Sequence, residues 1–150
     1  MHRDGSLTRM SGNPQDLARF DLPTIDEETA PFWDGMRAGT LLLRRCRACA
    51  ALTYYPRPFC PECWSDDVDW QAASGKATLY THSTVYMNDL PPFGEQVPYV
   101  AAVVELEEGP RMMTQVIDCP PESLAMGMAL TAEFRELTPE VTIAVFRPAS

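Results

Sequence analysis

The chain has 150 residues, with 12 Lys and Arg against 21 Asp and Glu, and a formal net charge of −9. Its 45% hydrophobic and 22% charged residues indicate a globular protein rather than a disordered one. The acidic balance argues against general nucleic-acid binding, which relies on basic charge against phosphate. No run approaches the roughly 18–20 apolar residues of a membrane helix, and residues 1–17 have no apolar core like that of a signal peptide. We therefore expect a cytoplasmic protein with no membrane and no nucleic-acid partner.

The N-terminal part is predicted to be an arm followed by a short helix. Residues 1–23 are polar and interrupted by Gly and Pro, which is typical of a flexible arm. Within residues 24–40, Pro31 suits a first helical turn and Gly39 suits a helix end, although Gly35 weakens the helix prediction. An apolar stripe of this docking helix would contain Phe32, Trp33 and Met36. It either packs on this chain or docks on another one.

Residues 41–72 contain four cysteines with the spacing of a rubredoxin-like zinc ribbon. Two C-x-x-C pairs are separated by ten residues, and they supply Cys46, Cys49, Cys60 and Cys63. Such pairs present four thiolates to one tetrahedral ion. Zn²⁺ is favoured over a single Fe, which spacing alone does not exclude, and four protein ligands make the site structural rather than catalytic. Disulfides are disfavoured in a reducing cytosol, and a redox C-x-x-C usually comes as one pair.

Residues 73–150 change character and predict a mainly β fold. They are rich in β-branched and aromatic residues between turn signals. Five strands are expected over 76–87, 97–106, 111–117, 128–137 and 141–146, with an extra connection after the third. Five strands with this connectivity fit a closed OB-fold barrel, which leaves no exposed sheet edge. The fold class is therefore mainly β, with a short N-terminal helix, a four-cysteine zinc ribbon and a five-stranded OB-fold barrel.

Neither of the two remaining candidates for catalysis has a predicted partner. Cys119 lies in the string D-C-P-P, and His82 lies in a predicted strand among Thr and Ser residues. Nothing in the sequence places a base beside the thiol, and the other histidine, His2, falls in the predicted arm. We expect no catalytic residue in this chain.

The order of these modules, together with several strings, resembles a known family. The strings are A-P-F-W-D-G-M-R-A-G at 30–39, L-L-L-R-R-C-R-A-C at 41–49, P-R-P-F-C-P-E-C at 56–63, P-Y-V-A-A-V-V-E-L at 98–106 and E-G-P-R at 108–111. From about residue 22 to its end, the chain resembles the acyl-CoA-associated OB-fold proteins that carry a rubredoxin-like zinc ribbon.

This resemblance implies an accessory subunit that is inactive alone. The implied partner is a thiolase-like catalytic subunit with thiolase, aldolase or acyltransferase chemistry, so the assembly would be a hetero-oligomer of lipid metabolism. The subunit would support its partner and help to hold acyl-CoA. One alternative is a hot-dog-fold enoyl-CoA hydratase as partner. Another is a nucleic-acid-binding module, since ribbons and OB barrels both serve that purpose.

Two further features bear on the ribbon. Family ribbons commonly place Gly after each C-x-x-C, whereas this chain has Ala50 and Trp64 there, which puts the turn geometry in question.

Five arginines also gather around the ribbon, namely Arg37, Arg44, Arg45, Arg47 and Arg57. Guanidinium groups suit phosphate geometry, so the cluster predicts acyl-CoA phosphate contacts, with Arg47 and Arg57 the favoured residues. The alternative is a set of salt bridges within the chain or to a partner.

Overall fold

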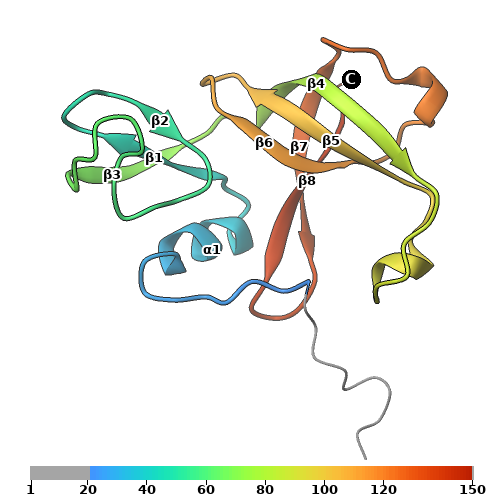
Figure 1. Cartoon of the computed structure of the whole chain (residues 1–150), viewed down its shortest axis with the longest axis horizontal. Helices are drawn as coiled ribbons and strands as arrows, with labels where there is room; N and C mark the ends of the chain where they lie inside the picture. The colour runs from blue at the N-terminus through green and yellow to red at the C-terminus, as the bar shows by residue number, and fades with distance from the viewer. Residues whose placement is uncertain (1–20, 150) are drawn as a thin grey trace, which may run out of the picture.

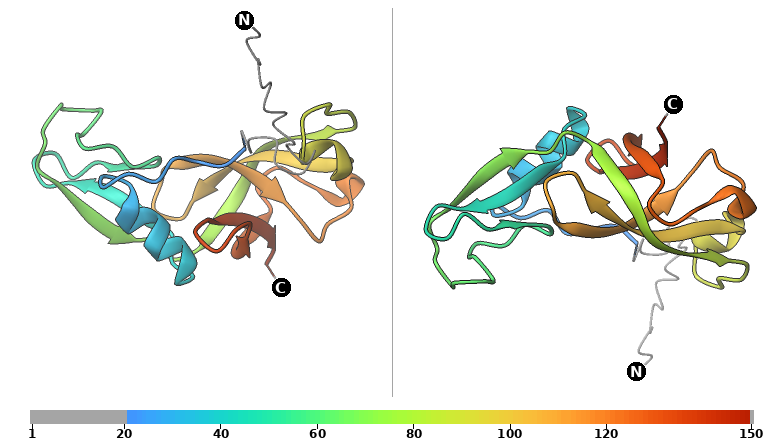
Figure 2. Two further views of the ribbon diagram at one scale, coloured as in Figure 1. Left: turned by 90° about the horizontal axis from the view of Figure 1, so that it is seen from below. Right: turned by 90° about the horizontal axis from the view of Figure 1, so that it is seen from above.

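The computed structural model describes residues 21–149, and the predicted arm lies mostly outside this range. A three-stranded sheet occupies one end of the molecule and a closed five-stranded barrel the other, with a single helix contacting both (Figure 1). Views from below and above show the same separation of ribbon and barrel along the long axis (Figure 2). Within residues 21–149, no helix combines the length and the apolar character needed to cross a bilayer.

Helix α1 (Ala30–Arg37) packs on its own chain. Its apolar stripe of Phe32, Trp33 and Met36 is buried. A Cβ atom on Gly35 would lie only 3.0 Å from both Leu42 Cδ1 and the Thr40 carbonyl oxygen. The glycine that weakened the helix prediction therefore permits a close approach of α1 to the strand that follows.

The ribbon sheet contains β1 (Leu42–Cys46), β2 (Leu52–Thr53) and β3 (Val68–Ala72). Strand β1 lies between the other two and is antiparallel to both. Its register sets Arg45 opposite Leu52 on one side and Asp69 on the other. Cys46 ends β1 and Cys49 follows in the β1–β2 connection, while Cys60 and Cys63 lie in the β2–β3 connection, so the two pairs come together at one end of the sheet.

The barrel confirms the predicted fold class. Its strands are β4 (Lys76–Val85), β5 (Tyr99–Leu106), β6 (Arg111–Val116), β7 (Ala129–Glu136) and β8 (Thr142–Pro148). They close in the order β4-β5-β6-β8-β7, with β4 pairing β7 and a parallel contact between β6 and β8. Two 3₁₀ turns lie in the connections, η2 (Phe93–Glu95) between β4 and β5 and η3 (Pro121–Ser123) between β6 and β7.

One apolar core runs from the barrel into the helix and the start of the ribbon. Strand β5 alternates strictly, with every second residue from Val100 to Leu106 buried. The same cluster includes Phe146, α1 and the buried Leu41. At the barrel end of the ribbon sheet, the Ala73 amide donates to the Leu41 carbonyl at 2.8 Å and extends the β1–β3 pairing. The ribbon is therefore joined to the barrel by packing as well as by the chain.

Candidate metal centre and the ribbon surface

Each cysteine pair sits on the same kind of turn. In the first turn the Ala50 amide donates to the Cys46 carbonyl at 2.9 Å, and in the second the Trp64 amide donates to the Cys60 carbonyl at 2.8 Å. The turns repeat because each C-x-x-C segment folds back after its first cysteine. Two such turns facing each other present two thiols each to a common point.

The four thiols lie in the arrangement that one tetrahedral ion requires. All four sulfur atoms lie within 4.8 Å of one another; they belong to Cys46, Cys49, Cys60 and Cys63. The Cys46–Cys63 and Cys49–Cys60 sulfur pairs are each 3.6 Å apart. A metal–sulfur bond of about 2.3 Å implies sulfur separations of about 3.8 Å in a tetrahedral site. The residues therefore fit a four-thiolate metal site with no open position for water or substrate.

Neighbouring amides and thiols shift the pKa values of Cys46 and Cys49 in opposite directions. The Cys49 amide donates to the Cys46 sulfur and lowers the pKa of Cys46 to about 7. The Ala51 amide lowers the pKa of Cys49, but proton sharing with Cys60 and Cys63, together with burial, outweighs it and raises that pKa to about 12. A divalent metal would replace the retained protons, so its binding would be coupled to proton release. Held by these four cysteines, it would cross-link the two turns.

Ala50 and Trp64, which stand where family ribbons commonly have glycine, keep the turn geometry at a cost in conformational free energy. Ala50 has φ +64° and Trp64 has φ +66°, both in the left-handed region. A Cβ atom crowds the following carbonyl oxygen there, which costs roughly 1–2 kcal/mol per residue. Both turns therefore have the expected backbone, although neither holds the residue best suited to it.

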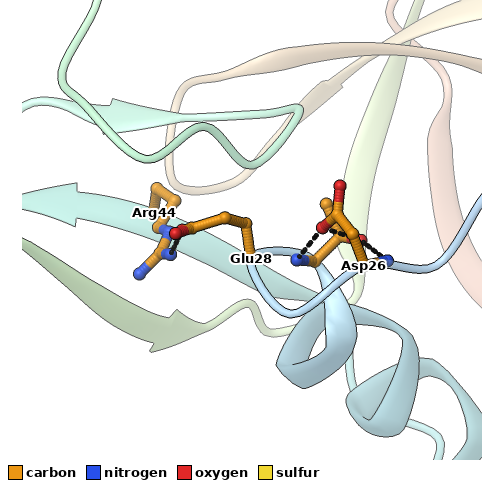
Figure 3. Close-up of polar contacts among 4 residues, drawn as sticks. Asp26, Glu28 and Arg44 are labelled. Atoms are coloured by element: carbon orange, nitrogen blue, oxygen red, sulfur yellow. Dashed lines mark hydrogen bonds and ion pairs between the residues drawn. The ribbon is translucent and has the colours of Figure 1, made fainter.

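Arg44 is committed to the fold rather than to a ligand. Its guanidinium lies 3.9 Å from a Glu28 carboxylate oxygen (Figure 3). It also lies 3.7 Å from the centroid of the Trp70 ring. The segment before α1 is fixed by Asp26, whose Oδ1 accepts hydrogen bonds from the amide and the hydroxyl of Thr29. The same amide lowers the pKa of Asp26. These contacts of Arg44 could not be predicted from the sequence, because they depend on the register that pairs Arg44 with Trp70.

The two arginines predicted to contact phosphate have different surroundings. Arg47 donates from Nε to Asp69 at 3.1 Å and pairs with Asp67 at 3.6 Å, and Asp69 raises the pKa of Arg47. Arg57 is exposed and has no ion pair or hydrogen bond among residues 21–149. Of the five arginines, Arg37, Arg44 and Arg47 form ion pairs, whereas Arg45 and Arg57 form none among residues 21–149.

Cys119 and His82 lie in separate surface hollows. Cys119 lines a hollow of about 480 Å³ together with Arg135. His82 lines a shallower one of about 210 Å³ together with Met113. No described histidine lines the hollow of the thiol, so the structure does not assemble a nucleophile and base from these residues.

Fold and site together define a class of protein, a four-cysteine ribbon joined through a helix to an OB barrel. Family models agree with both parts. Residues 33–69 match the rubredoxin-like zinc ribbon domain of ChsH2, and residues 70–135 match the C-terminal OB-fold domain of ChsH2. The chain belongs to this family, whose archaeal relatives are described as DUF35 domain-containing scaffold proteins.

Relatives and solved structures show how far the likeness extends. A probable enoyl-CoA hydratase alpha subunit of Thermomonospora curvata is 35% identical over 85% of this chain, which spans only 39% of that relative's length. A DUF35 domain-containing scaffold protein of Methanocaldococcus jannaschii is 38% identical over 62% of this chain and 66% of its own length. One chain of the Ltp2-ChsH2(DUF35) aldolase superposes with a TM-score of 0.76 and 35% identity, covering 86% of this chain and 100% of its own length.

Proposed function

We propose that this chain is a non-catalytic accessory subunit of an acyl-CoA-processing enzyme complex, and that its partner is a thiolase-like subunit with thiolase, aldolase or acyltransferase chemistry. The full-length match to one chain of the Ltp2-ChsH2(DUF35) aldolase carries this proposal. The closed four-thiol site supports it, because such a site offers no coordination position for chemistry. The chain stabilises the assembly and the partner performs the reaction.

A hot-dog-fold enoyl-CoA hydratase is the second candidate partner. The hydratase alpha subunit of Thermomonospora curvata supports it, but this chain spans only 39% of that protein. Purified thiolase-fold and hot-dog-fold proteins from the same genome, each mixed separately with this chain, separate the two candidates. Stable association with a thiolase-fold protein is the expected result. Association with a hot-dog protein alone would favour the second candidate, and association with neither would remove both.

We further propose that the four cysteines hold zinc and that the protein is cytoplasmic. Zinc is the usual ion of closed four-thiolate ribbons, and free thiols persist in a reducing compartment. Metal analysis of the purified chain is expected to give one zinc per chain. Iron would reveal itself by thiolate-to-iron absorption in the visible range, and a chain that folds without any metal would contradict the site.

We also propose that Arg47 and Arg57 contact acyl-CoA. Arg57 is better placed for it, because the charge of Arg47 is already met by Asp67 and Asp69. Calorimetric titration of CoA into the chain and into the assembled complex tests this contact. Arg57→Ala is expected to weaken CoA binding more than Arg47→Ala, and equal binding by wild type and both variants would rule the contact out.

A further inference from the structure

Trp64 is a large apolar residue held in an unfavourable place. Its backbone has φ +66°, where glycine is favoured, and 74% of the residue is exposed. The barrel does not cover it, although it follows the ligand Cys63 directly. A tryptophan that is both strained and exposed contributes little to the fold of the chain alone, and local strain of this kind tends to gather at functional positions.

Trp64 belongs to a surface that is already ordered. Its ring stacks nearly parallel on Phe59, with ring centroids 5.3 Å apart and an interplanar angle of 12°. Two exposed prolines lie in the same loop, Pro58 just before Phe59 and Pro61 between Phe59 and Trp64. Proline and ring stacking both restrict the unbound conformations, so binding through this surface loses little conformational entropy. We call Arg57, Phe59 and Trp64 the ribbon anchor.

A positive charge without an internal partner lies close to these rings in the sequence. Arg57 precedes Phe59 by two residues and is unpaired among residues 21–149, although the chain has 21 acidic against 12 basic residues. By contrast, Arg44 and Arg47 nearby are both paired with carboxylates. Exposed Trp and Arg side chains are the residues that most often dominate protein–protein binding energy. The ribbon anchor therefore fits an apolar socket with a carboxylate at its rim.

From these observations we infer that the ribbon anchor is the main contact of this chain with its catalytic partner. The Phe59–Trp64 pair fills an apolar socket on the partner, and Arg57 meets a partner carboxylate. This inference rests on the proposed function as an accessory subunit. It also gives Arg57 a different ligand from the phosphate of CoA, and the experiment separates the two ligands.

The experiment uses the full metal-loaded chain and the purified thiolase-fold protein that binds it, without CoA. Trp64→Gly removes the indole and relieves the backbone strain, so the variant is expected to fold at least as stably and to keep one metal per chain. Its Kd for the partner is expected to rise by about 30-fold or more. Phe59→Ala and Arg57→Ala test the other two members of the anchor, and each is expected to weaken binding.

Controls use exposed residues elsewhere. Met113 on the barrel and Tyr86 after β4 are 77% and 75% exposed, so Met113→Ala and Tyr86→Ala match Trp64 in exposure. Both are expected to leave the Kd unchanged within about twofold. A wild-type Kd retained by Trp64→Gly would overturn the inference while leaving the proposed function intact. Failure of the wild-type chain to bind any candidate partner would instead remove the proposed function and the inference together.

The final measurement tests whether CoA binds at the ribbon anchor. Titration of CoA into the chain alone is expected to give no binding that depends on Trp64. If Trp64→Gly abolished CoA binding while the partner affinity stayed the same, the aromatic pair would be a nucleotide-stacking site and the docking assignment would be wrong.

Discussion

The ribbon and the barrel are stabilised by different means. The ribbon has a three-stranded sheet whose β2 contains only Leu52–Thr53, and its two cysteine turns meet at the metal site. The barrel closes all five of its strands on one another around a core that includes Phe146, whose exposure is 0%. Small modules with little core depend on a staple such as a metal, whereas a closed barrel does not. The ribbon should therefore respond to metal and the barrel to core packing.

The largest expected effect is the loss of the ribbon when the metal site is broken. Cys46→Ser removes a ligand, and structural zinc contributes apparent binding energies of about 10–16 kcal/mol in small fingers. All three tryptophans, Trp33, Trp64 and Trp70, lie in α1 and the ribbon. Their fluorescence should therefore report unfolding of this half, while far-UV circular dichroism keeps the barrel signal. Cys119→Ser is the matched control and should keep one metal per chain.

The second-largest expected effect comes from a substitution in the barrel core. Phe146→Ala opens a cavity in the barrel core and should lower the free energy of unfolding by about 3–5 kcal/mol. Urea unfolding followed by circular dichroism measures it, with metal content unchanged in the native state. Met113→Ala, at a position 77% exposed on the same barrel, should change stability by less than about 0.5 kcal/mol. Equal effects of the two substitutions would contradict the assignment of the core.

A third effect concerns alkaline pH and the helix–ribbon junction. Burial raises the pKa of Tyr54 to about 12 from its ordinary value of 10.0, and its ring lies 6.0 Å from that of Phe32. Because the folded state favours the neutral phenol, this stabilisation is complete below pH 10 and is lost as the pH rises from 10 towards 12. Tryptophan fluorescence and phenolate absorbance should change together in that window. Tyr54→Phe should weaken this pH dependence, and an unaltered profile would argue against it.

The smallest effect tests the strain in the ribbon turns. Ala50→Gly should stabilise the metal-loaded ribbon by about 1 kcal/mol, because Ala50 has φ +64°. The same substitution two residues earlier, Ala48→Gly, should instead destabilise by about 0.4–1 kcal/mol, because it only adds freedom to the unfolded chain. Thermal unfolding monitored by tryptophan fluorescence compares the two. Shifts of the same sign would contradict the strain account.

Sequence analysis predicted the features that repeat along the chain. The alternation from Val100 to Leu106 and the two C-x-x-C pairs are local patterns, and the fold class follows from them. The surroundings of single side chains depend on register between distant strands, which no local pattern encodes. Arg44 faces Trp70 and Arg47 reaches Asp69 only because β1 and β3 pair as they do. For this reason the sequence could mark the arginine cluster but not separate Arg45 and Arg57 from the arginines that form ion pairs.

Closure of the barrel was predicted from the strand count, but which strands close it and how exposed Trp64 is could not be predicted. Closure depends on the pairing of β4 with β7, whose residues lie far apart in the chain. Trp64 directly follows Cys63, and its 74% exposure depends on how distant parts of the chain pack, which no local pattern encodes.

Acyl-CoA turnover by three samples tests the central claim most directly. The samples are the metal-loaded chain alone, its purified thiolase-fold partner alone, and the two combined, each at the same concentration. The account predicts no turnover by the chain alone and the highest turnover by the combined sample, because the chain supports chemistry performed by its partner. Sustained turnover by the metal-loaded chain alone would contradict it.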